Sequence, residues 1–285
     1  MSEMLILSGT RQLQSLGLGT WRMGESAARR KSEIAAVRLA LDMGWRVIDT
    51  AEMYGDGKAE EIVGAAVSEA LRAGALARDE LFVVSKVYPH NATSRGTAQA
   101  CERSLARLGL DHLDAYLLHW RGSVPLEETV DVLEALQRRG RIRSWGVSNF
   151  DLADMQELLE VPGGERCVTN QIYYSLGSRG PGFDLVPWLQ RHGIMTMAYS
   201  PIDQGALAKS AKLRDIAARR GATPAQIALA WLVEQEGVMA IPKAADQKHL
   251  RENFASRQLV LTDADRLEID AAFPPPKRAF TLAMR

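Results

Sequence analysis

The chain alternates short apolar runs with amphipathic stretches, and this pattern constrains the fold more than any other feature. Eight apolar runs have the length of a buried parallel strand, and segments between them carry apolar residues at helical spacing. Eight strand–helix units in about 250 residues predict an α/β protein with a (β/α)8 TIM barrel. A doubly wound open sheet shows the same alternation, so that alternative stays open. The predicted strands are residues 16–20, 46–49, 81–86, 113–119, 144–148, 169–172, 194–199 and 238–241.

Local signals mark where several helices begin and end. Asp151 can cap the helix that follows it, and Thr223-Pro224-Ala225-Gln226 is typical of a capping box with proline at the first helical position. Glycine readily adopts the left-handed conformation that ends a helix. The glycines at predicted helix ends are Gly44, Gly140, Gly193 and Gly221.

The length of the chain bears on its domain organisation. The 285 residues would fit two average domains, but one barrel of about 250 residues uses nearly all of them. We therefore expect a single barrel domain over residues 1–285. The segment before Leu16 has room for a short hairpin, and the segment after Leu261 predicts an added C-terminal helix followed by a proline-rich tail.

Charge and cysteine content exclude several classes of protein. The 35 basic residues equal the 35 acidic ones, whereas binding to nucleic acid or an anionic membrane needs an excess of Lys and Arg. No apolar run approaches the roughly 18 residues of a membrane span, and the first residues do not form a signal peptide, so we expect a cytoplasmic protein without nucleic-acid or membrane partners. Cys101 and Cys167 lack zinc spacing and the histidines form no HExxH motif, so we expect no metal site.

Ionisable side chains lie at the ends of three successive predicted strands. Asp49 closes the second strand and Tyr54 follows it in the loop, Lys86 closes the third, and His119 closes the fourth. In a barrel these strand ends meet at one mouth, where catalytic groups lie. A cation beside the phenol should lower the tyrosine pKa from its ordinary value of about 10, and a carboxylate should keep the lysine charged. Each residue alone also fits a cap or packing role, but together they predict a proton donor aimed at a developing alkoxide.

Short motifs are spread in order over almost the whole chain. They are Leu16-Gly17-Leu18-Gly19-Thr20-Trp21, Ile48-Asp49-Thr50-Ala51-Glu52-Met53-Tyr54-Gly55, Ser85-Lys86, Leu117-Leu118-His119-Trp120, Gly146-Val147-Ser148-Asn149-Phe150, Asn170-Gln171, Tyr199-Ser200-Pro201 and Ile241-Pro242-Lys243. With these motifs the sequence resembles the aldo-keto reductase superfamily, and within it the bacterial members of the methylglyoxal reductase type.

The resemblance implies an activity and a set of catalytic residues. It implies NADPH-dependent reduction of aldehydes or ketones to alcohols, including small 2-oxoaldehydes such as methylglyoxal, by a monomer whose partner is a small-molecule carbonyl substrate. Tyr54 would be the general acid, and His119 would orient the carbonyl. Lys86, paired with Asp49, would tune the acid. Two other functions stay open, namely a non-catalytic nicotinamide-binding regulatory module and a barrel isomerase or lyase without redox chemistry.

The resemblance also implies where the nicotinamide lies. Ser148, Asn149 and Gln171 match positions that hold its carboxamide, and Tyr199 matches an aromatic that stacks on its ring. A planar side chain suits the ring, and amides supply paired donors and acceptors. Further implied cofactor positions are Gly19, Thr20, Trp21, Asp49, Ser200, Pro201, Ile202, Gln204, Gly205, Leu207, Ile241, Glu252 and Asn253.

Two positions bear on the choice between NADPH and NADH. Lys243 matches the lysine that meets the 2′-phosphate of NADPH in the family. His249 occupies a position often held by arginine, which binds phosphate bidentately, whereas histidine is only partly charged near neutrality. We therefore expect NADPH as the cofactor, with NADH as an alternative.

The substrate pocket is predicted in outline only. Trp21, Met53, Tyr88 and Trp120 fall in loops near the predicted mouth, although packing at the barrel rim explains them equally well. The loop after His119 is short, which favours an open or small pocket suited to small aldehydes.

Overall fold

The computed structural model describes residues 4–7 and 11–284, and eight strands form one parallel sheet. Each of these strands pairs with the next along the chain, from β3 to β10. The strands are β3 (Leu18–Gly19), β4 (Val47–Asp49), β5 (Phe82–Val87), β6 (Leu113–Leu118), β7 (Ile142–Ser148), β8 (Thr169–Tyr173), β9 (Met195–Tyr199) and β10 (Val238–Ala240).

The sheet closes on itself between its first and last strands. Leu16, before β3, forms a parallel bridge with Ala240. A second parallel bridge joins Gly19 to Lys243. A larger residue than glycine would not fit at position 19, because its Cβ would lie 2.8 Å from the Ile241 carbonyl oxygen. Closure confirms the predicted barrel and excludes the open doubly wound sheet.

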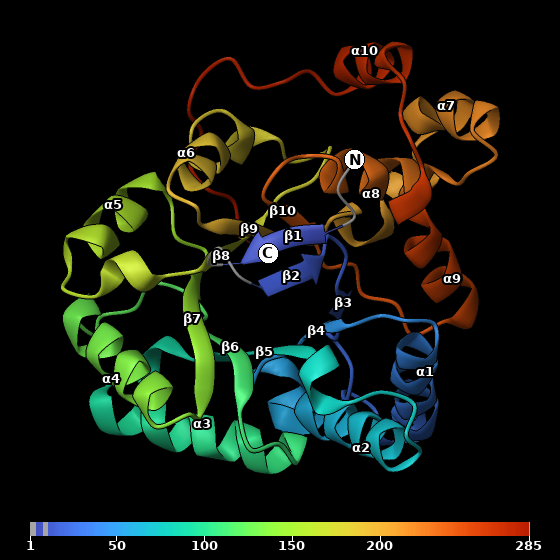
Figure 1. Cartoon of the computed structure of the whole chain (residues 1–285). Coiled ribbons are helices and arrows are strands. Elements are labelled where there is room, and N and C mark those ends of the chain that lie inside the picture. The colour runs from blue at the N-terminus through green and yellow to red at the C-terminus, as the bar shows by residue number, and fades with distance from the viewer. Residues whose placement is uncertain (1–3, 8–10, 285) are drawn as a thin grey trace.

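Helices surround the ring of strands, as Figure 1 shows. This arrangement is expected because the strands of a parallel barrel are covered on the outside by their crossover helices. The helices are α1 (Arg30–Asp42), α2 (Lys58–Arg72), α3 (Ser94–Leu108), α4 (Leu126–Arg138), α5 (Leu152–Glu160), α6 (Leu185–Arg191), α7 (Arg214–Arg219), α8 (Pro224–Val233), α9 (Gln247–Ala255) and α10 (Asp263–Ala272).

The predicted helix signals are confirmed. The Asp151 carboxylate accepts a hydrogen bond from the Asp154 amide at 2.9 Å, at the start of α5. At the start of α8, Thr223 accepts from the Gln226 amide at 3.3 Å, and the Gln226 side chain accepts from the Thr223 amide at 2.9 Å. The four glycines predicted at helix ends all have positive φ angles. Local sequence therefore sets these helix boundaries.

The predicted N-terminal hairpin closes one end of the barrel. Strands β1 (Met4–Leu7) and β2 (Arg11–Gln14) are antiparallel, and Figure 1 shows them across the ring of strands. Leu5 and Leu13 are buried in one apolar cluster with Phe82 and Met195, which begin β5 and β9. The hairpin therefore seals the amino ends of the strands and leaves their carboxyl ends open.

Side chains that point into the barrel change from apolar to polar along the strands. Residues two apart in a strand share a face. Val47 and Val84 lie in the interior apolar cluster, and two residues further on come Asp49 and Lys86. The strands that fill the amino end with apolar groups thus carry ionisable groups to the carboxyl end.

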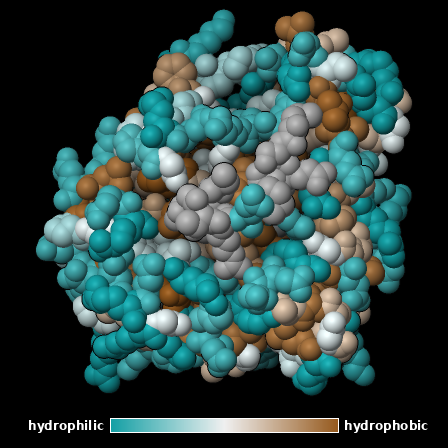
Figure 2. All heavy atoms as spheres, in the orientation of Figure 1, coloured by the Kyte–Doolittle hydropathy of each residue, from teal (hydrophilic) through white to brown (hydrophobic). Residues whose placement is uncertain are grey.

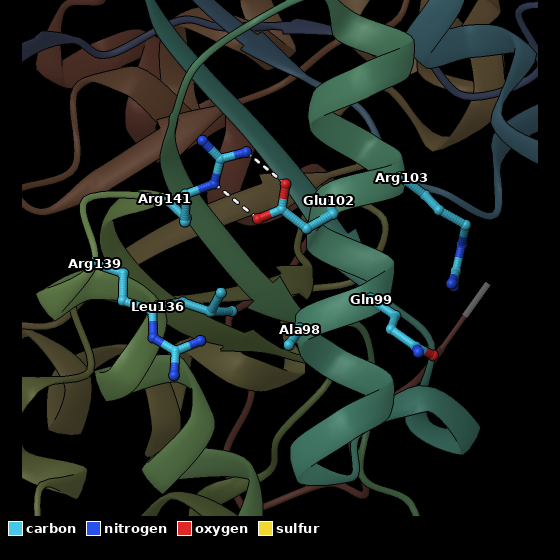
Figure 3. Close-up of a pocket in the computed structure, with 7 residues that line it drawn as sticks. All are labelled: Ala98, Gln99, Glu102, Arg103, Leu136, Arg139 and Arg141. Atoms are coloured by element: carbon cyan, nitrogen blue, oxygen red, sulfur yellow. Dashed lines mark hydrogen bonds and ion pairs between the residues drawn. The ribbon is translucent and has the colours of Figure 1, made fainter.

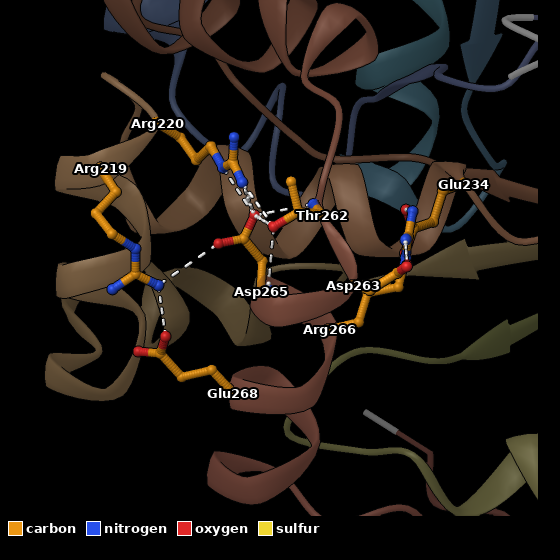
Figure 4. Close-up of polar contacts among 8 residues, drawn as sticks. All are labelled: Arg219, Arg220, Glu234, Thr262, Asp263, Asp265, Arg266 and Glu268. Carbon is orange, nitrogen blue, oxygen red and sulfur yellow. Dashed lines mark hydrogen bonds and ion pairs between the residues drawn. The ribbon is translucent and has the colours of Figure 1, made fainter.

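The predicted C-terminal helix is α10, and a polar network ties it to α7 and α8 (Figure 4). The Asp265 carboxylate accepts hydrogen bonds from Arg220 at 2.7 Å and from the Thr262 hydroxyl at 2.8 Å. Arg266 donates to Glu234 at 2.9 Å. Burial alone would raise the pKa of Asp265, but hydrogen bonds from Thr262 and Arg220 lower it to about 2. The added helix is therefore held by specific charged contacts.

Figure 2 shows the face that carries the hairpin. Hydrophilic side chains cover most of its outer part, and hydrophobic ones occur in scattered groups. None of the helices in the described part of the chain combines the length and apolar character that crossing a membrane requires.

Candidate active site

Lys86 is the centre of a buried polar cluster at the carboxyl ends of β4 and β5. Its Nζ lies 2.8 Å and 2.9 Å from the two carboxylate oxygens of Asp49. It also donates to the Thr50 carbonyl at 2.8 Å and to the Tyr54 hydroxyl oxygen at 3.2 Å. These partners occupy the three N–H donors of the ammonium, so its position is fixed. Three of the four predicted catalytic residues are thus in direct contact.

Tyr54 holds its proton in this environment. Burial, and then the negative charge of Asp49, raise the pKa of Tyr54 well above its ordinary value of 10. The prediction that the neighbouring cation lowers this pKa is therefore wrong, because burial disfavours the charged phenolate most and the negative charge of Asp49 disfavours it further. Since the Tyr54 oxygen accepts from Lys86, its O–H can point elsewhere. The geometry suits a proton donor.

His119 follows β6 and lies beside Tyr54. Their ring centroids are 5.9 Å apart and the rings meet edge to face at 74°. Burial, and then the charge of Lys86, lower the pKa of His119 well below its ordinary value of 6.5. Its Nδ1 is buried and has no hydrogen-bond partner among the described residues. The imidazole is therefore neutral near pH 7, when it can donate one hydrogen bond without carrying a charge.

Asp49 has a second donor on the far side of the barrel. The Gln171 Nε2 donates to the Asp49 Oδ1 at 2.7 Å, and both side chains are buried. Gln171 belongs to β8, four strands away from β4 in a barrel of eight, so its side chain reaches across the interior. The Asp49 backbone is also held, because the Thr20 hydroxyl donates to its carbonyl at 3.0 Å.

The residues predicted around the nicotinamide form one hydrogen-bonded set. The Gln171 carbonyl accepts from the Ser148 hydroxyl and from the Asn149 amide, both at 2.9 Å. The Tyr199 hydroxyl donates to the Asn149 side-chain oxygen at 2.9 Å, and the Asn149 side-chain nitrogen donates to the His119 carbonyl at 3.1 Å. The structure thus brings Ser148, Asn149, Gln171 and Tyr199 together beside the Lys86 cluster.

The implied cofactor positions between Ser200 and Leu207 lie in the loop after β9. Three of its residues, Ser200, Asp203 and Gln204, have φ angles of 48°, 49° and 54°. Such angles are costly for residues other than glycine, and they persist where the surrounding contacts impose them. Pro201, Ile202, Gly205 and Leu207 lie in the same loop.

The positions predicted near the 2′-phosphate lie after β10 and on α9. Lys243 is exposed, and no carboxylate among the described residues lies within ion-pair distance of its Nζ. His249 is also exposed, with its Nδ1 3.8 Å from the Asp246 carboxylate. Glu252 lies 3.8 Å from Lys248, and Asn253 is buried. No contact joins Lys243 to His249 in this part of the structure.

Two of the four predicted substrate residues gather around His119. The Trp120 ring centroid lies 4.9 Å from that of His119, and the Tyr88 ring meets Trp120 at 90° with 5.7 Å between centroids. Met53 is half-buried next to Tyr54 and packs against the core. Trp21 is exposed, and its recorded ring contact is with Arg22. Tyr88 and Trp120 therefore form an aromatic wall beside His119, and Trp21 makes no ring contact with it among the described residues.

Comparison with known proteins decides the family of the chain. Residues 15–273 match the sequence profile of the Aldo/keto reductase family. The chain belongs to this family. The resemblance drawn from the motifs is thereby confirmed, and membership makes the chain an oxidoreductase.

Relatives of this aldo/keto reductase match it over its full length. Methylglyoxal reductase YeaE of Escherichia coli strain K12 is 47% identical over 287 residues, which cover 99% of this chain and 99% of that protein. The crystal structure of an aldo/keto reductase from Klebsiella pneumoniae in complex with NADP and acetate is 46% identical, with a TM-score of 0.95 and 100% of both chains covered. A Klebsiella pneumoniae aldo-keto reductase in complex with NADPH is 45% identical, with a TM-score of 0.94 and the same coverage.

One residue of this aldo/keto reductase site escaped prediction although it lies inside a motif. Glu52 is buried, and its carboxylate accepts from the Tyr88 amide at 2.9 Å and from the Asn91 side chain at 3.1 Å. Arg103 lies 3.5 Å from the same carboxylate. Glu52 thus ties the loop that carries Tyr54 to the loop that carries Tyr88. A carboxylate that follows a buried strand in the chain was the available signal.

A second missed residue is Asp203, in the loop after β9. Its Oδ1 accepts from the Tyr173 hydroxyl at 2.7 Å and from the Ser175 hydroxyl at 2.5 Å. These contacts hold the loop against the end of β8 and account for its left-handed backbone. No sequence spacing indicates them, because they join the loop after β9 to the end of β8 and to Ser175 just after it.

A hollow of about 430 Å³ on the outside of the aldo/keto reductase barrel is not part of this site (Figure 3). It lies between α3 and α4, beside Arg141, which precedes β7 at the end of the barrel away from Ser148. Arg141 is paired with Glu102 at 2.8 Å. The hollow therefore lies away from the carboxyl ends of the strands, where the Lys86 cluster is.

Proposed function

We propose that this aldo/keto reductase reduces aldehyde and ketone carbonyls to alcohols with NADPH, and that small 2-oxoaldehydes such as methylglyoxal are among its substrates. The observation that carries the proposal is the contact of Tyr54 with Lys86 at 3.2 Å, next to a neutral His119. A full-length relative named a methylglyoxal reductase and two relatives solved with NADP or NADPH support it.

The residues present fit a nicotinamide nucleotide. The Gln171 Oε1 accepts no hydrogen bond from the described residues, so it can accept one from a carboxamide. Tyr199 is half-buried and can present a ring face. Lys243 carries a positive charge without a carboxylate partner in the described chain, which suits a phosphate. NADPH, when bound, supplies the hydride that the carbonyl carbon receives.

Tyr54 acts as the general acid in this proposal. As the new C–H bond forms, negative charge develops on the carbonyl oxygen, and the Tyr54 O–H gives its proton to that oxygen. The phenolate left behind lies 3.2 Å from the Lys86 ammonium, which stabilises it. Solvent then returns one proton to Tyr54, so each turnover consumes one hydride and one proton.

His119 orients the carbonyl in the same proposal. A neutral imidazole can donate one hydrogen bond to the carbonyl oxygen, and its low pKa keeps it from competing with Tyr54 as the acid. Tyr88 and Trp120 offer flat apolar surfaces beside it. Such a wall accommodates the planar dicarbonyl of a 2-oxoaldehyde.

Steady-state assays of the purified protein test this function. We expect loss of NADPH absorbance with methylglyoxal and with 4-nitrobenzaldehyde, and slower turnover with NADH. Cofactor binding is followed in parallel by quenching of tryptophan fluorescence. Binding of NADPH without turnover of either aldehyde would contradict the proposal and favour a non-catalytic nicotinamide-binding module.

We also propose that residues 1–285 act as one domain and as a monomer in the cytoplasm. Light scattering should give a mass near the 31.4 kDa of the chain. A mass of two chains would contradict the monomer.

A further inference from the structure

Gln171 makes hydrogen bonds on two sides of the site, one facing the proposed nicotinamide position and the other facing the proton donor. Its backbone carbonyl accepts from the Ser148 hydroxyl and the Asn149 amide at 2.9 Å each, on the side where the nicotinamide is proposed to lie. Its side chain donates to the Asp49 Oδ1 at 2.7 Å, on the side of the proton donor. One residue therefore connects two sets of groups that come from opposite strands of the barrel.

The hydrogen bond between Gln171 and Asp49 is short and buried. Gln171 and Asp49 are both buried, so the hydrogen bond is shielded from water. The Asp49 Oδ1 is shared between the Lys86 ammonium at 2.8 Å and the Gln171 amide at 2.7 Å. The other contact recorded for this amide nitrogen is with the Met197 sulfur at 3.9 Å, which is a weak acceptor. The carboxylate is thus held from two directions.

We propose that Gln171 is a positioning residue for the proton donor: it fixes the Asp49 carboxylate, so that the Lys86 ammonium stays against the Tyr54 oxygen. This role is additional to any contact of Gln171 with the nicotinamide. The catalytic consequence rests on the proposed function, whereas the contact between Gln171 and Asp49 does not. Misplacement of a catalytic group by about 1 Å can lower a rate about 10²-fold, so a neutral amide outside direct reach of the substrate can affect the rate.

A spectroscopic test uses the protein without cofactor. The side-chain N–H resonance of Gln171, identified by its loss in Gln171→Leu, should be shifted downfield because it faces a carboxylate at short range. In Asp49→Asn the acceptor is neutral, and the resonance should move back toward the position of an ordinary glutamine amide. A resonance at the ordinary position that does not respond to Asp49→Asn would overturn the contact and the proposal with it.

A kinetic test separates positioning from cofactor binding. At saturating NADPH, Gln171→Leu should lower kcat about 10- to 100-fold. In the Asp49→Asn background the same substitution should lower kcat much less, because the group that it positions is altered. A Gln171→Leu variant that raises KM for NADPH and keeps its kcat would overturn the proposal and leave the proposed function intact.

Met197→Leu is the matched control. It removes the other contact of the Gln171 amide nitrogen and keeps the hydrogen bond to Asp49, and it nearly conserves buried volume. We expect its kcat to stay within about 2-fold of the parent. If the parent protein turns over no carbonyl, the proposed function fails, and the amide resonance still decides the contact. If Gln171→Leu does not fold, the resonance is assigned by through-bond experiments on the parent, and the comparison of parent with Asp49→Asn is the deciding measurement.

Discussion

The two ends of the barrel interior are built from the same strands and differ in every other respect. At the amino end Phe82 and Met195 pack against Leu5 and Leu13 of the hairpin. At the carboxyl end the interior holds Asp49, Lys86 and Gln171, which are joined by hydrogen bonds. Apolar packing stabilises the folded protein, whereas buried ionic groups must be desolvated and contribute little net stability. The difference teaches that the same strands supply apolar packing at their amino ends and a buried polar cluster at their carboxyl ends, where we propose the chemistry takes place.

The largest expected effect comes from the carboxyl end. Tyr54→Phe should lower kcat by about 10²- to 10⁴-fold, because the general acid is lost while the ring still packs. Steady-state assays measure the rate, and urea unfolding should show stability close to the parent. NADPH should still bind. Near-normal turnover by this variant would contradict the difference proposed between the two ends, because the polar end would then not supply the general acid.

The opposite result is expected at the amino end. Leu13→Ala should lower the free energy of unfolding by about 2–5 kcal/mol, because it leaves a cavity where the hairpin meets the barrel. Urea unfolding measures this change, and kcat should stay within about 2-fold at a temperature where the variant is folded. Gln12→Ala, at the exposed neighbouring position, is the control and should change stability by less than about 0.5 kcal/mol. A large loss of kcat in Leu13→Ala would show that the two ends are coupled.

The polar network of α10 supplies a charged site outside both ends. Asp265→Asn should lower the free energy of unfolding at pH 7 by about 2 kcal/mol, because the folded pKa of about 2 lies below the unfolded value of 3.8. Since the folded pKa is the lower one, this stabilisation is present above pH 3.8 and is lost as the pH falls toward 2.

Glu268→Gln on the same helix serves as the control for Asp265. Glu268 is 41% exposed and pairs with Arg219 at the surface, so its loss should cost less than about 1 kcal/mol. Equal losses from the two substitutions at pH 7 would show that burial does not distinguish these carboxylates.

A smaller effect is expected at the rim of the carboxyl end. His249→Arg should tighten NADPH about 10-fold more than NADH, because arginine can bind the 2′-phosphate bidentately. Fluorescence titration with both cofactors measures the change, and Lys248→Arg controls for added arginine at a neighbouring exposed position. Equal tightening of both cofactors would place His249 away from the phosphate.

The smallest expected effect concerns His119, whose imidazole should not titrate near neutral pH. Its pKa lies well below 6.5, so kcat/KM should show no limb due to this imidazole between pH 6.5 and 8. The folded pKa is lower than the unfolded one, so the stability that His119 contributes is full above pH 6.5 and is lost as the pH falls below it. NMR of the histidine ring should show the neutral form at pH 6.5. A charged ring at pH 6.5 would contradict this prediction and would make His119 an acid that competes with Tyr54.

Sequence predicted the fold well because its signals are local and repeated. Eight apolar runs became eight strands, and caps such as Asp151 lie where the helix signals put them. The contacts among Asp49, Tyr54 and Lys86 were also predictable, since strand ends in a barrel converge. The direction of the Tyr54 pKa shift could not be predicted, because it depends on how deeply the phenol is buried and on how close the Asp49 carboxylate lies.

Contacts across the barrel could not be predicted from the sequence. The hydrogen bond from Gln171 to Asp49 joins residues far apart in the chain, and no local pattern encodes it. The carboxylates of Glu52 and Asp203 likewise find their partners only after loops from different strands meet. Pairwise geometry in three dimensions decides these contacts, whereas periodicity reports only on one element at a time.

The junction that closes the barrel, between the segments around β3 and β10, has a consequence for synthesis of the protein on the ribosome. Leu16 pairs with Ala240 and Gly19 with Lys243, so the ring cannot close until the chain has emerged past Lys243. Until then β3 presents an unpaired edge, which invites pairing with another chain. The strands that carry Asp49 and Lys86 are therefore synthesised early, but the closed barrel around them can form only near the end of translation.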